Sequence, residues 1–431
     1  MNVFWNGWRS LRERENGNCR EINIYDQGGN NVKKILFVIN TLGRAGAETA
    51  LMELMRNIDK TKNELHLFVL LGQGEMIRHV PKDVKLLNEE YDACSVLSRE
   101  GKKHLKRHVM KTLFAHGTII RMMPYLLRQL FGMLRRGRMQ TDKLLWKAMA
   151  YGAPRFAEHY DLAVAYLEGG ATYYVADYVK AEKKASFLHV DYGRAGYNKS
   201  LDDGCYEKMD RIFTVSDEVR ESFLKVYPEY RERTEVFHNL LNQEAIRELA
   251  REPGGFTDKF DGFRILTVGR LTSQKSFEIS VEAMRLLKDD GEKVRWYVLG
   301  EGEKRGELEA RIKTLGLTED FLLPGAVENP YSYLAQTDLY VHATRFEGKS
   351  IAIQEAQTLG CTILVSDCSG NREQVIQEED GLLCELTPEA ICAGIKSLLH
   401  DEGKRRRLGQ AAAKKKISDV RELEKLLTLL D

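Results

Sequence analysis

The chain of 431 residues alternates short apolar runs with amphipathic helical stretches, and this alternation restricts its possible folds more than any other feature. Residues 34–40 (KILFVIN) form an apolar, β-branched run typical of a strand buried on both faces. A glycine-containing loop and a helical pattern over residues 47–58 follow it. Further strand-like runs lie at 65–71, 162–167, 186–189 and 211–215. Strands that alternate with helices predict a parallel sheet with right-handed crossovers.

A second series of the same kind follows a turn-rich break at residues 252–262 (EPGGFTDKFDG). Its predicted strands lie at 263–268, 294–299, 321–323, 339–342, 362–365 and 381–384, and its predicted helices include 277–287, 305–315 and 350–359. The sequence therefore predicts an α/β protein with two Rossmann-like domains whose parallel sheets face each other across a cleft. Ligands of such sheets sit beyond the carboxyl ends of the strands, so we expect the functional residues in the post-strand loops.

These observations divide the chain into four parts. We expect a flexible extension at residues 1–32, an N-terminal Rossmann-like domain at 33–251 and a C-terminal one at 252–416. Residues 417–431 are expected to form a helix that packs back on the N-terminal domain.

Composition excludes several classes of protein. With 43% apolar and 30% charged residues, the chain is neither disordered nor collagen-like. No apolar run predicts a signal peptide or a membrane-spanning helix. The seven cysteines are odd in number and never form a two-residue clamp, which predicts a reduced protein in the cytoplasm.

A basic segment at residues 102–147 holds twelve Lys or Arg residues and one acid, Asp142, although the formal net charge of the chain is only +1. Four of its arginines recur at multiples of seven residues: Arg107, Arg121, Arg128 and Arg135. Apolar residues lie between them, and Pro124 is expected to begin a new helix. This pattern predicts peripheral binding to an anionic membrane surface, the alternative being a helix packed on the domain with solvated arginines. No motif for reading nucleic acid occurs, so nucleic acid is not an expected partner.

Two loops after predicted strands carry candidate ligand-binding groups. In residues 41–48 (TLGRAGAE), glycines that include Gly46 allow a ligand to approach the backbone ahead of a helix N-terminus, although an ordinary turn has the same pattern. The third glycine of the dinucleotide-binding fingerprint is absent. In residues 268–275 (VGRLTSQK), Arg270 and Lys275 together can bind a diphosphate, the alternative being solvated charges on a loop.

A third motif, residues 347–355 (EGKSIAIQE), contains two carboxylates: Glu347 in a loop and Glu355 in the predicted helix that follows it. Gly348 permits close approach of the backbone, and Ser350 is placed to cap the helix. Glu347 and Glu355 can accept hydrogen bonds from two separate sets of hydroxyls on one ligand. An acid and base pair of a hydrolase is the rival interpretation.

His189 ends the predicted strand at residues 186–189 and is therefore expected to point toward the cleft. A histidine there can hydrogen-bond a sugar hydroxyl or a developing charge, whereas a lone histidine is more often a structural residue. Asp191, two residues further on, is a weaker candidate.

Together, these motifs and their order resemble the large family of retaining, GT-B fold glycosyltransferases that includes bacterial lipopolysaccharide, capsule and phosphatidylinositol mannosyltransferases. The similarity runs from about residue 33 to 399 and is strongest at residues 346–360 (FEGKSIAIQEAQTLG) and 268–271. Two glutamates with seven residues between them are the family's signature. Two positions depart from the pattern: Ser276 replaces the usual glycine after the lysine, and Asn239-Leu240 replaces an Asn-Gly pair.

The resemblance implies a role for each candidate residue. Glu347 is expected to contact the donor sugar, Glu355 the ribose, and Arg270 with Lys275 the diphosphate. The remaining residues expected at the donor or the reacting sugar are Gly46, His189, Gly348, Ser350 and Ile351.

The function predicted from the sequence is therefore a retaining transfer of a sugar from a nucleotide diphosphate, a UDP- or GDP-sugar, to a glycan or lipid-linked acceptor in cell-surface polysaccharide synthesis. No Asp-any-Asp motif for a divalent cation occurs, so we expect neither a metal nor a cofactor. A sugar-nucleotide epimerase and a non-catalytic GT-B subunit that binds glycan or a partner are the alternatives.

Overall fold

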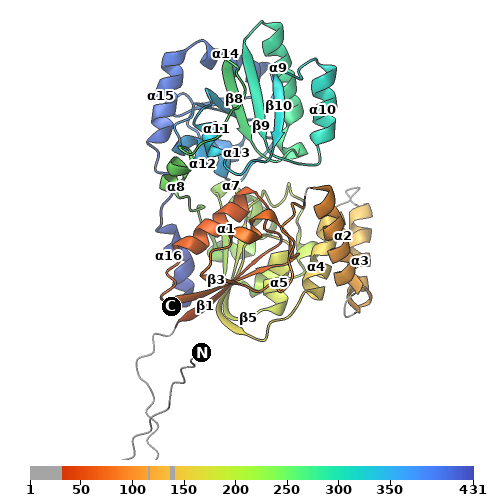
Figure 1. The fold of residues 1–431 in the computed structure, drawn as a ribbon. Helices are drawn as coiled ribbons and strands as arrows, with labels where there is room; N and C mark the ends of the chain where they lie inside the picture. The colour runs from red at the N-terminus through yellow and green to blue at the C-terminus, as the bar shows by residue number, and fades with distance from the viewer. Residues whose placement is uncertain (1–31, 97, 115–116, 136–140) are drawn as a thin grey trace, which may run out of the picture.

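The structure is a computed structural model that describes residues 32–96, 98–114, 117–135 and 141–431. Two lobes stack on each other, and each is built on one parallel sheet with helices packed around it (Figure 1). The expected extension, apart from Val32, lies outside the described residues, as do residues 115–116 and 136–140 of the basic segment.

The N-terminal lobe contains a seven-stranded sheet in the order β3-β2-β1-β4-β5-β6-β7. Its strands are β1 (Lys33–Ile39), β2 (Asn63–Val69), β3 (Val84–Leu86), β4 (His159–Ala165), β5 (Lys180–Leu188), β6 (Arg211–Thr214) and β7 (Thr234–Val236). All their pairings are parallel, and the central strand β1 is fully buried from Ile35 onward. This confirms the predicted doubly wound lobe. The prediction missed β3 and β7, because three residues are too few to show a period.

The helices of this lobe follow its strands as right-handed crossovers require. They are α1 (Gly46–Asn57), α5 (Gly170–Tyr178), α6 (Lys199–Asp202), α7 (Asp217–Val226) and α8 (Gln243–Leu249). Helix α7 begins after Ser216, whose side chain caps it by accepting a hydrogen bond from the backbone N–H of Val219 at 3.3 Å.

Between β3 and β4 the chain makes a three-helix excursion of α2 (Arg99–Phe114), α3 (Thr118–Arg135) and α4 (Thr141–Gly152) at one side of the lobe (Figure 1). The prediction that Pro124 begins a helix is wrong, because Pro124 lies inside α3. A proline there leaves the carbonyl of Ile120 without its helical partner. Both residues are exposed, so water can satisfy that carbonyl.

The C-terminal lobe contains a six-stranded sheet in the order β10-β9-β8-β11-β12-β13, again with parallel pairings. Its strands are β8 (Phe263–Val268), β9 (Val294–Leu299), β10 (Phe321–Gly325), β11 (Leu339–His342), β12 (Ile363–Ser366) and β13 (Leu382–Cys384). Its helices are α9 (Phe277–Asp289), α10 (Arg305–Thr314), α11 (Tyr331–Leu334), α12 (Ile351–Thr358), α13 (Ser369–Arg372), α14 (Pro388–Leu399) and α15 (Glu402–Ala413). The strand order changes direction between β8 and β11, which is where sheets of this kind bind ligands.

The last helix, α16 (Glu422–Leu427), lies against the N-terminal lobe (Figure 1). Its Leu423 and Leu426 belong to a hydrophobic cluster centred on β1 and β2. Lys425 Nζ donates to the backbone oxygen of Val236 at 2.7 Å, and the backbone N–H of His238 donates to Glu422 at 3.0 Å. The chain thus crosses between the lobes twice.

Candidate functional site

The C-terminal lobe joins its two charged loops at the point where the strand order changes. β8 and β11 are neighbours in the sheet, so the loops after them lie side by side. Gln274 connects these loops, because its side-chain amide donates to the backbone oxygen of Phe346 at 2.8 Å and its own backbone oxygen accepts from Arg345 at 2.9 Å. The loop with Arg270 and Lys275 is thereby fixed beside the loop with Glu347.

Lys275 and Glu347 form an ion pair, and His342 contacts both of them. Lys275 Nζ lies 3.0 Å from His342 Nε2, which is 3.2 Å from a Glu347 carboxylate oxygen. The other ring nitrogen, Nδ1, lies 3.1 Å from the Tyr340 hydroxyl. Because an ammonium can only donate, the network assigns Nε2 of His342 as the acceptor from Lys275 and Nδ1–H as the donor to Tyr340.

The charges in this cluster are set by burial and by the ion pair. Burial raises the pKa of Glu347, but the positive charge of the Lys275 ammonium outweighs it and lowers that pKa to about 2. Burial lowers the pKa of His342 to about 4, and the positive charge of Lys275 acts in the same direction. At neutral pH the cluster therefore holds a carboxylate, an ammonium and a neutral imidazole.

Glu355, which is separated from Glu347 by seven residues, lies on α12 and is buried. Its carboxylate accepts a hydrogen bond from the Tyr331 hydroxyl at 2.8 Å. Burial raises the pKa of Glu355 to about 7, against the opposing effect of that hydrogen bond. A buried carboxyl with this pKa can accept or donate a hydrogen bond near neutral pH, which suits a vicinal pair of hydroxyls.

Arg270 is exposed on the loop after β8, and its charge acts on carboxyl groups of the N-terminal lobe. Burial raises the pKa of Glu48 to about 7 and also raises that of Glu168, while the positive charge of Arg270 opposes both shifts. The charge of Arg270 is therefore felt in the opposite lobe. This is the position that a group needs in order to bind an anion held between the lobes.

The two lobes touch at residues that the sequence singles out. A Cβ on Gly348 would lie 2.7 Å from the backbone oxygen of His189, and a Cβ on Gly46 would lie 3.6 Å from Ile351 Cδ1. Gly348 thus allows close approach of the other lobe's backbone. An ion pair of 3.1 Å between Arg44 and Glu328 also joins the lobes.

His189 follows β5 and stacks on Phe187, with ring centroids 6.4 Å apart. Burial lowers the pKa of His189 to about 4, and its Nε2 atom is buried without a hydrogen-bond partner in the described part of the chain. Asp191 instead holds its own loop, since it accepts from the Ser222 hydroxyl at 2.5 Å and from the backbone of Arg194 at 3.0 Å.

Two serines of the motifs differ from what the sequence suggests. Ser350 stands at the N-cap position of α12 but makes no capping hydrogen bond, so the predicted cap is wrong. Its hydroxyl lies 3.5 Å from His342 Nε2 instead. Ser276, at the usual glycine position, has a left-handed backbone with φ of 48°, so the loop keeps the conformation that a glycine would adopt there.

Three further residues of this region were missed from the sequence. His342 ends β11, so the rule that singled out His189 would have found it. Gly300 and Gly302 follow β9, and a Cβ on Gly300 would lie 2.0 Å from the backbone oxygen of Gly269, so the glycine is needed where two loops cross. Two glycines directly after a strand were the available signal.

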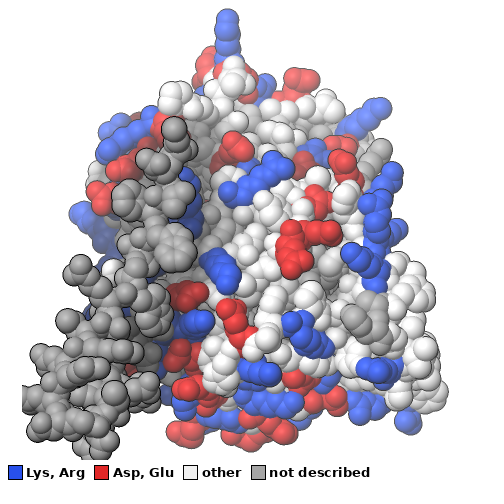
Figure 2. Space-filling view, turned by 60° about the horizontal axis from the view of Figure 1, so that its bottom comes forward, with Lys and Arg blue, Asp and Glu red and all other residues white. Residues whose placement is uncertain are grey.

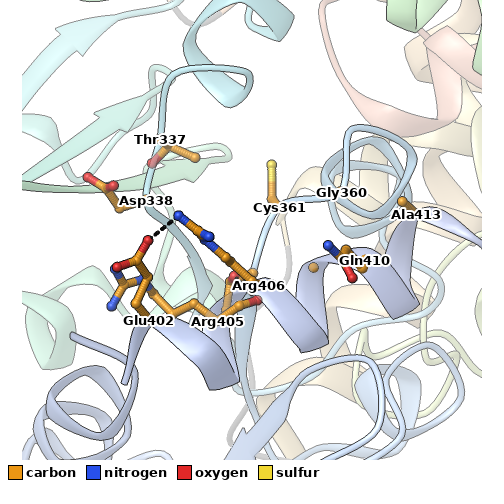
Figure 3. A pocket seen from close by; sticks show the side chains of 11 residues that line it. Thr337, Asp338, Gly360, Cys361, Glu402, Arg405, Arg406, Gln410 and Ala413 are labelled. Atoms are coloured by element: carbon orange, nitrogen blue, oxygen red, sulfur yellow. Dashed lines mark hydrogen bonds and ion pairs between the residues drawn. The ribbon is translucent and has the colours of Figure 1, made fainter. Parts of the chain in front are cut away.

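A cavity of about 410 Å³ lies at the other end of the C-terminal sheet (Figure 3). Asp338 and Thr362, which precede β11 and β12, line it together with Arg405 and Arg406 of α15. It therefore opens at the amino ends of the strands, away from Lys275. Within the described residues, no group of three or more His, Cys, Asp or Glu side chains could hold a metal ion.

Two Rossmann-like lobes with a charged cluster at the switch point of the second sheet define the GT-B architecture. Solved structures share it. The chain superposes on Anabaena Alr3699/HepE in complex with UDP and glucose with a TM-score of 0.64 and 16% identity, covering 92% of this chain and 98% of that one. TarM of S. aureus gives a TM-score of 0.63 at 12% identity, covering 93% and 100%.

The sequence of the C-terminal lobe is similar to a family of this class. Residues 256–415 match the family described as "Glycosyl transferases group 1".

Two relatives match the sequence of this chain over part of their own length. The chain is 34% identical over 207 residues to a Campylobacter jejuni N-acetylgalactosamine-N,N'-diacetylbacillosaminyl-diphospho-undecaprenol 4-alpha-N-acetylgalactosaminyltransferase, covering 48% of this chain and 55% of that protein. It is 26% identical to the amylovoran biosynthesis glycosyltransferase AmsD of Erwinia amylovora, covering 35% and 42%. The chain thus spans about half the length of the relatives that it matches in sequence.

Proposed function

We propose that this protein is a retaining glycosyltransferase that moves a sugar from a nucleotide diphosphate to a glycan or lipid-linked acceptor in the synthesis of a surface polysaccharide. The observation that carries the proposal is the cluster of Lys275, Glu347 and His342 at the switch point, on the loops where the group 1 family has its paired glutamates. UDP and glucose in the HepE complex support a UDP-sugar donor, with a GDP-sugar as the other candidate.

In this proposal, Arg270 and Lys275 bind the diphosphate, and their positive charges stabilise the negative charge that develops on the leaving group. Glu347, which is ionised and paired with Lys275, accepts hydrogen bonds from hydroxyls of the donor sugar. Glu355 binds the ribose hydroxyls. No step requires a metal ion, because two cationic side chains supply the charge.

The other candidate residues surround the donor. Gly46 and Ile351 pack on each other at the boundary between the lobes, and Gly348 and Ser350 lie beside Glu347 and His342. We assign His189 to the neighbourhood of the reacting sugar; its buried Nε2 atom, which has no hydrogen-bond partner among the described residues, supports this role.

The acceptor is proposed from the relatives' names. One relative acts on a diphospho-undecaprenol-linked sugar, and another belongs to amylovoran biosynthesis. The first of these names describes an alpha linkage, which supports retention of the configuration of an α-linked donor. We place the protein in the cytoplasm at the inner face of the cell membrane; six described cysteines are free, as is typical of a reducing compartment. None of the described helices is long and apolar enough to cross a bilayer.

The donor can be identified by thermal unfolding in the presence of a panel of UDP- and GDP-sugars. A ligand at 100 times its dissociation constant adds about 2.7 kcal/mol of stability, which raises the unfolding temperature measurably. Product analysis with the donor that binds then separates transfer from epimerisation. A panel in which no nucleotide sugar stabilises the protein would contradict the proposal.

A further inference from the structure

Helices α2 and α3 carry most of the large apolar side chains that the described part of the chain exposes to solvent. On these helices the exposed residues are Met110, Phe114, Ile120, Met123, Leu127, Phe131 and Leu134. Phe131 is 66% and Ile120 75% exposed, values that core residues do not reach. Elsewhere the exposed large apolar residues are scattered in the sequence: Val32, Tyr91, Ile376 and Val420. We call the first set the α2–α3 face.

Helix α3 separates its residues into three faces. At 100° per residue, its five members of the α2–α3 face fall within about 80° of the circumference. The buried residues, such as Met122 and Gln129, lie on the opposite side and pack against the lobe. Arg121, Arg128 and Arg135 form a column along one flank of the apolar face, because they are seven residues apart. The apolar face is therefore additional to the face that the fold buries.

The charge around this face is strongly positive. Helix α2 carries six Lys or Arg residues and α3 carries three, against one acid, Glu100. The side chains of Lys103, Lys106 and Arg107 are exposed. Figure 2 shows Lys and Arg side chains along the right-hand edge of the molecule, the side on which α2 and α3 lie in Figure 1.

We propose that the α2–α3 face inserts into the headgroup region of an anionic phospholipid bilayer. The apolar side chains enter the boundary of the acyl chains, while the arginine column and the lysines of α2 remain at the level of the phosphates. An apolar stripe with cations on its flank matches an anionic membrane, since the stripe is compatible with the acyl chains and the cations with the negative headgroups. A second copy of this chain fits less well, because a symmetric pairing would place the same cationic flanks against each other.

The position of the face deepens the proposed function, on which this part of the inference rests. The backbone oxygen of Gly101, in the first turn of α2, accepts a hydrogen bond of 3.0 Å from Gln73, in the loop after β2. That loop also contacts the loop after β1, since the backbone of Leu42 donates to the Gln73 oxygen at 2.9 Å. The helices are thus anchored to the loops at the carboxyl ends of the N-terminal strands, the end of the sheet that faces the proposed donor site. A membrane-bound protein would then receive an acceptor on a lipid carrier at this edge.

Vesicle co-sedimentation without any nucleotide tests the membrane contact. The parent protein should bind vesicles of phosphatidylglycerol and phosphatidylcholine and bind vesicles of pure phosphatidylcholine much more weakly. The double variant Leu127→Ser/Phe131→Ser should lose at least about tenfold in affinity, because two large apolar side chains no longer insert. Each of Lys103→Gln and Lys106→Gln should cost about fivefold, the equivalent of about 1 kcal/mol per cation.

The double variant Ile376→Ser/Val420→Ser is the matched control, since it removes two exposed apolar side chains outside the face and should bind vesicles as the parent does. The inference is overturned if the parent does not bind anionic vesicles, or if the Leu127→Ser/Phe131→Ser variant binds them as well as the parent. It is also overturned if the parent is a dimer that this variant converts to a monomer.

Thermal unfolding with the UDP- and GDP-sugar panel, without vesicles, keeps the two proposals separate. The face variants should respond to nucleotide sugars as the parent does. Vesicle binding without any response to the panel would contradict the proposed function alone. A normal response without vesicle binding would contradict the membrane contact alone.

Discussion

Gly348 of the C-terminal lobe lies against His189 of the N-terminal lobe so closely that a Cβ on Gly348 would come within 2.7 Å of the His189 backbone oxygen. Neither a Cβ atom nor a backbone oxygen can move aside as the end of a flexible side chain could. The contact places the loop with Glu347 next to the strand end with the candidate histidine. The two lobes therefore meet at the proposed reaction centre, and the size of one residue limits how closely they approach.

The first prediction concerns this contact. Gly348→Ala should slow sugar transfer by about five- to 150-fold, since overpacking of this kind typically costs about 1–3 kcal/mol. Binding of a nucleoside diphosphate should change little, because Arg270 and Lys275 are left in place. Gly306→Ala is the control, since a Cβ there meets nothing within 4 Å. If both variants transfer at the parent's rate, the lobe contact is not part of the active arrangement.

The second prediction concerns Glu347. Glu347→Gln keeps the shape of the side chain but removes the negative charge that pairs with Lys275. Transfer should fall by about 10²- to 10³-fold, the range found when one stabilising group of an active site is removed. Affinity for the nucleoside diphosphate, measured by calorimetry, should fall much less. Equal losses of both would show that Glu347 does not act on the sugar.

The third prediction concerns His342, a positioning residue that reaches the donor only through Lys275 and Glu347. His342→Phe keeps a ring but removes the acceptor for Lys275, so kcat should fall by at least about tenfold, the loss of one hydrogen bond to a charged group. His342→Gln retains an acceptor and should recover part of that loss. A fall in stability with unchanged kcat would assign His342 a structural role only.

The fourth prediction concerns the pH dependence of stability. Glu355 has a pKa of about 7 in the folded protein and an ordinary value of 4.5, so the folded state binds more protons between these pH values. The free energy of unfolding should therefore fall as pH rises from about 4.5 to 7. Glu355→Gln removes this pH-dependent destabilisation. The free energy of unfolding of the variant should therefore exceed that of the parent by a margin that grows with pH, to roughly 3 kcal/mol at most by pH 8. Urea unfolding at pH 5 and pH 8 measures it, with exposed Glu319→Gln as the control. An advantage that does not grow with pH would contradict the buried environment of Glu355.

The order of the elements was predictable, because buried parallel strands leave continuous apolar runs such as residues 263–268, which form β8 as predicted. Short edge strands such as β3 have no such run. Pro124 was misassigned because its exposed position in α3, which makes the missing hydrogen bond tolerable, is a property of the packed lobe.

For the site, the residue types that follow predicted strands were enough to indicate Arg270, Lys275 and Glu347. Their pairing could not be predicted, since it depends on β8 and β11 being neighbours although about 70 residues separate them in the chain. His342, at the end of β11, could have been found by the rule that singled out His189, but its contacts with Lys275 and Glu347 arise only when these two strands lie side by side. Likewise, the solvent exposure of the α2–α3 face follows from which side of α3 the lobe covers.

If the C-terminal lobe binds a nucleotide sugar by its diphosphate, removal of the Arg270 side chain should lower the rate of sugar transfer most directly. The measurement is the initial rate of sugar transfer by Arg270→Ala and by the control Arg311→Ala, an exposed arginine on α10, with the donor that the panel identifies. We expect a loss of about 10²- to 10³-fold for Arg270→Ala and parental activity for the control. An Arg270→Ala protein that transfers sugar as fast as the parent would contradict diphosphate binding at this loop.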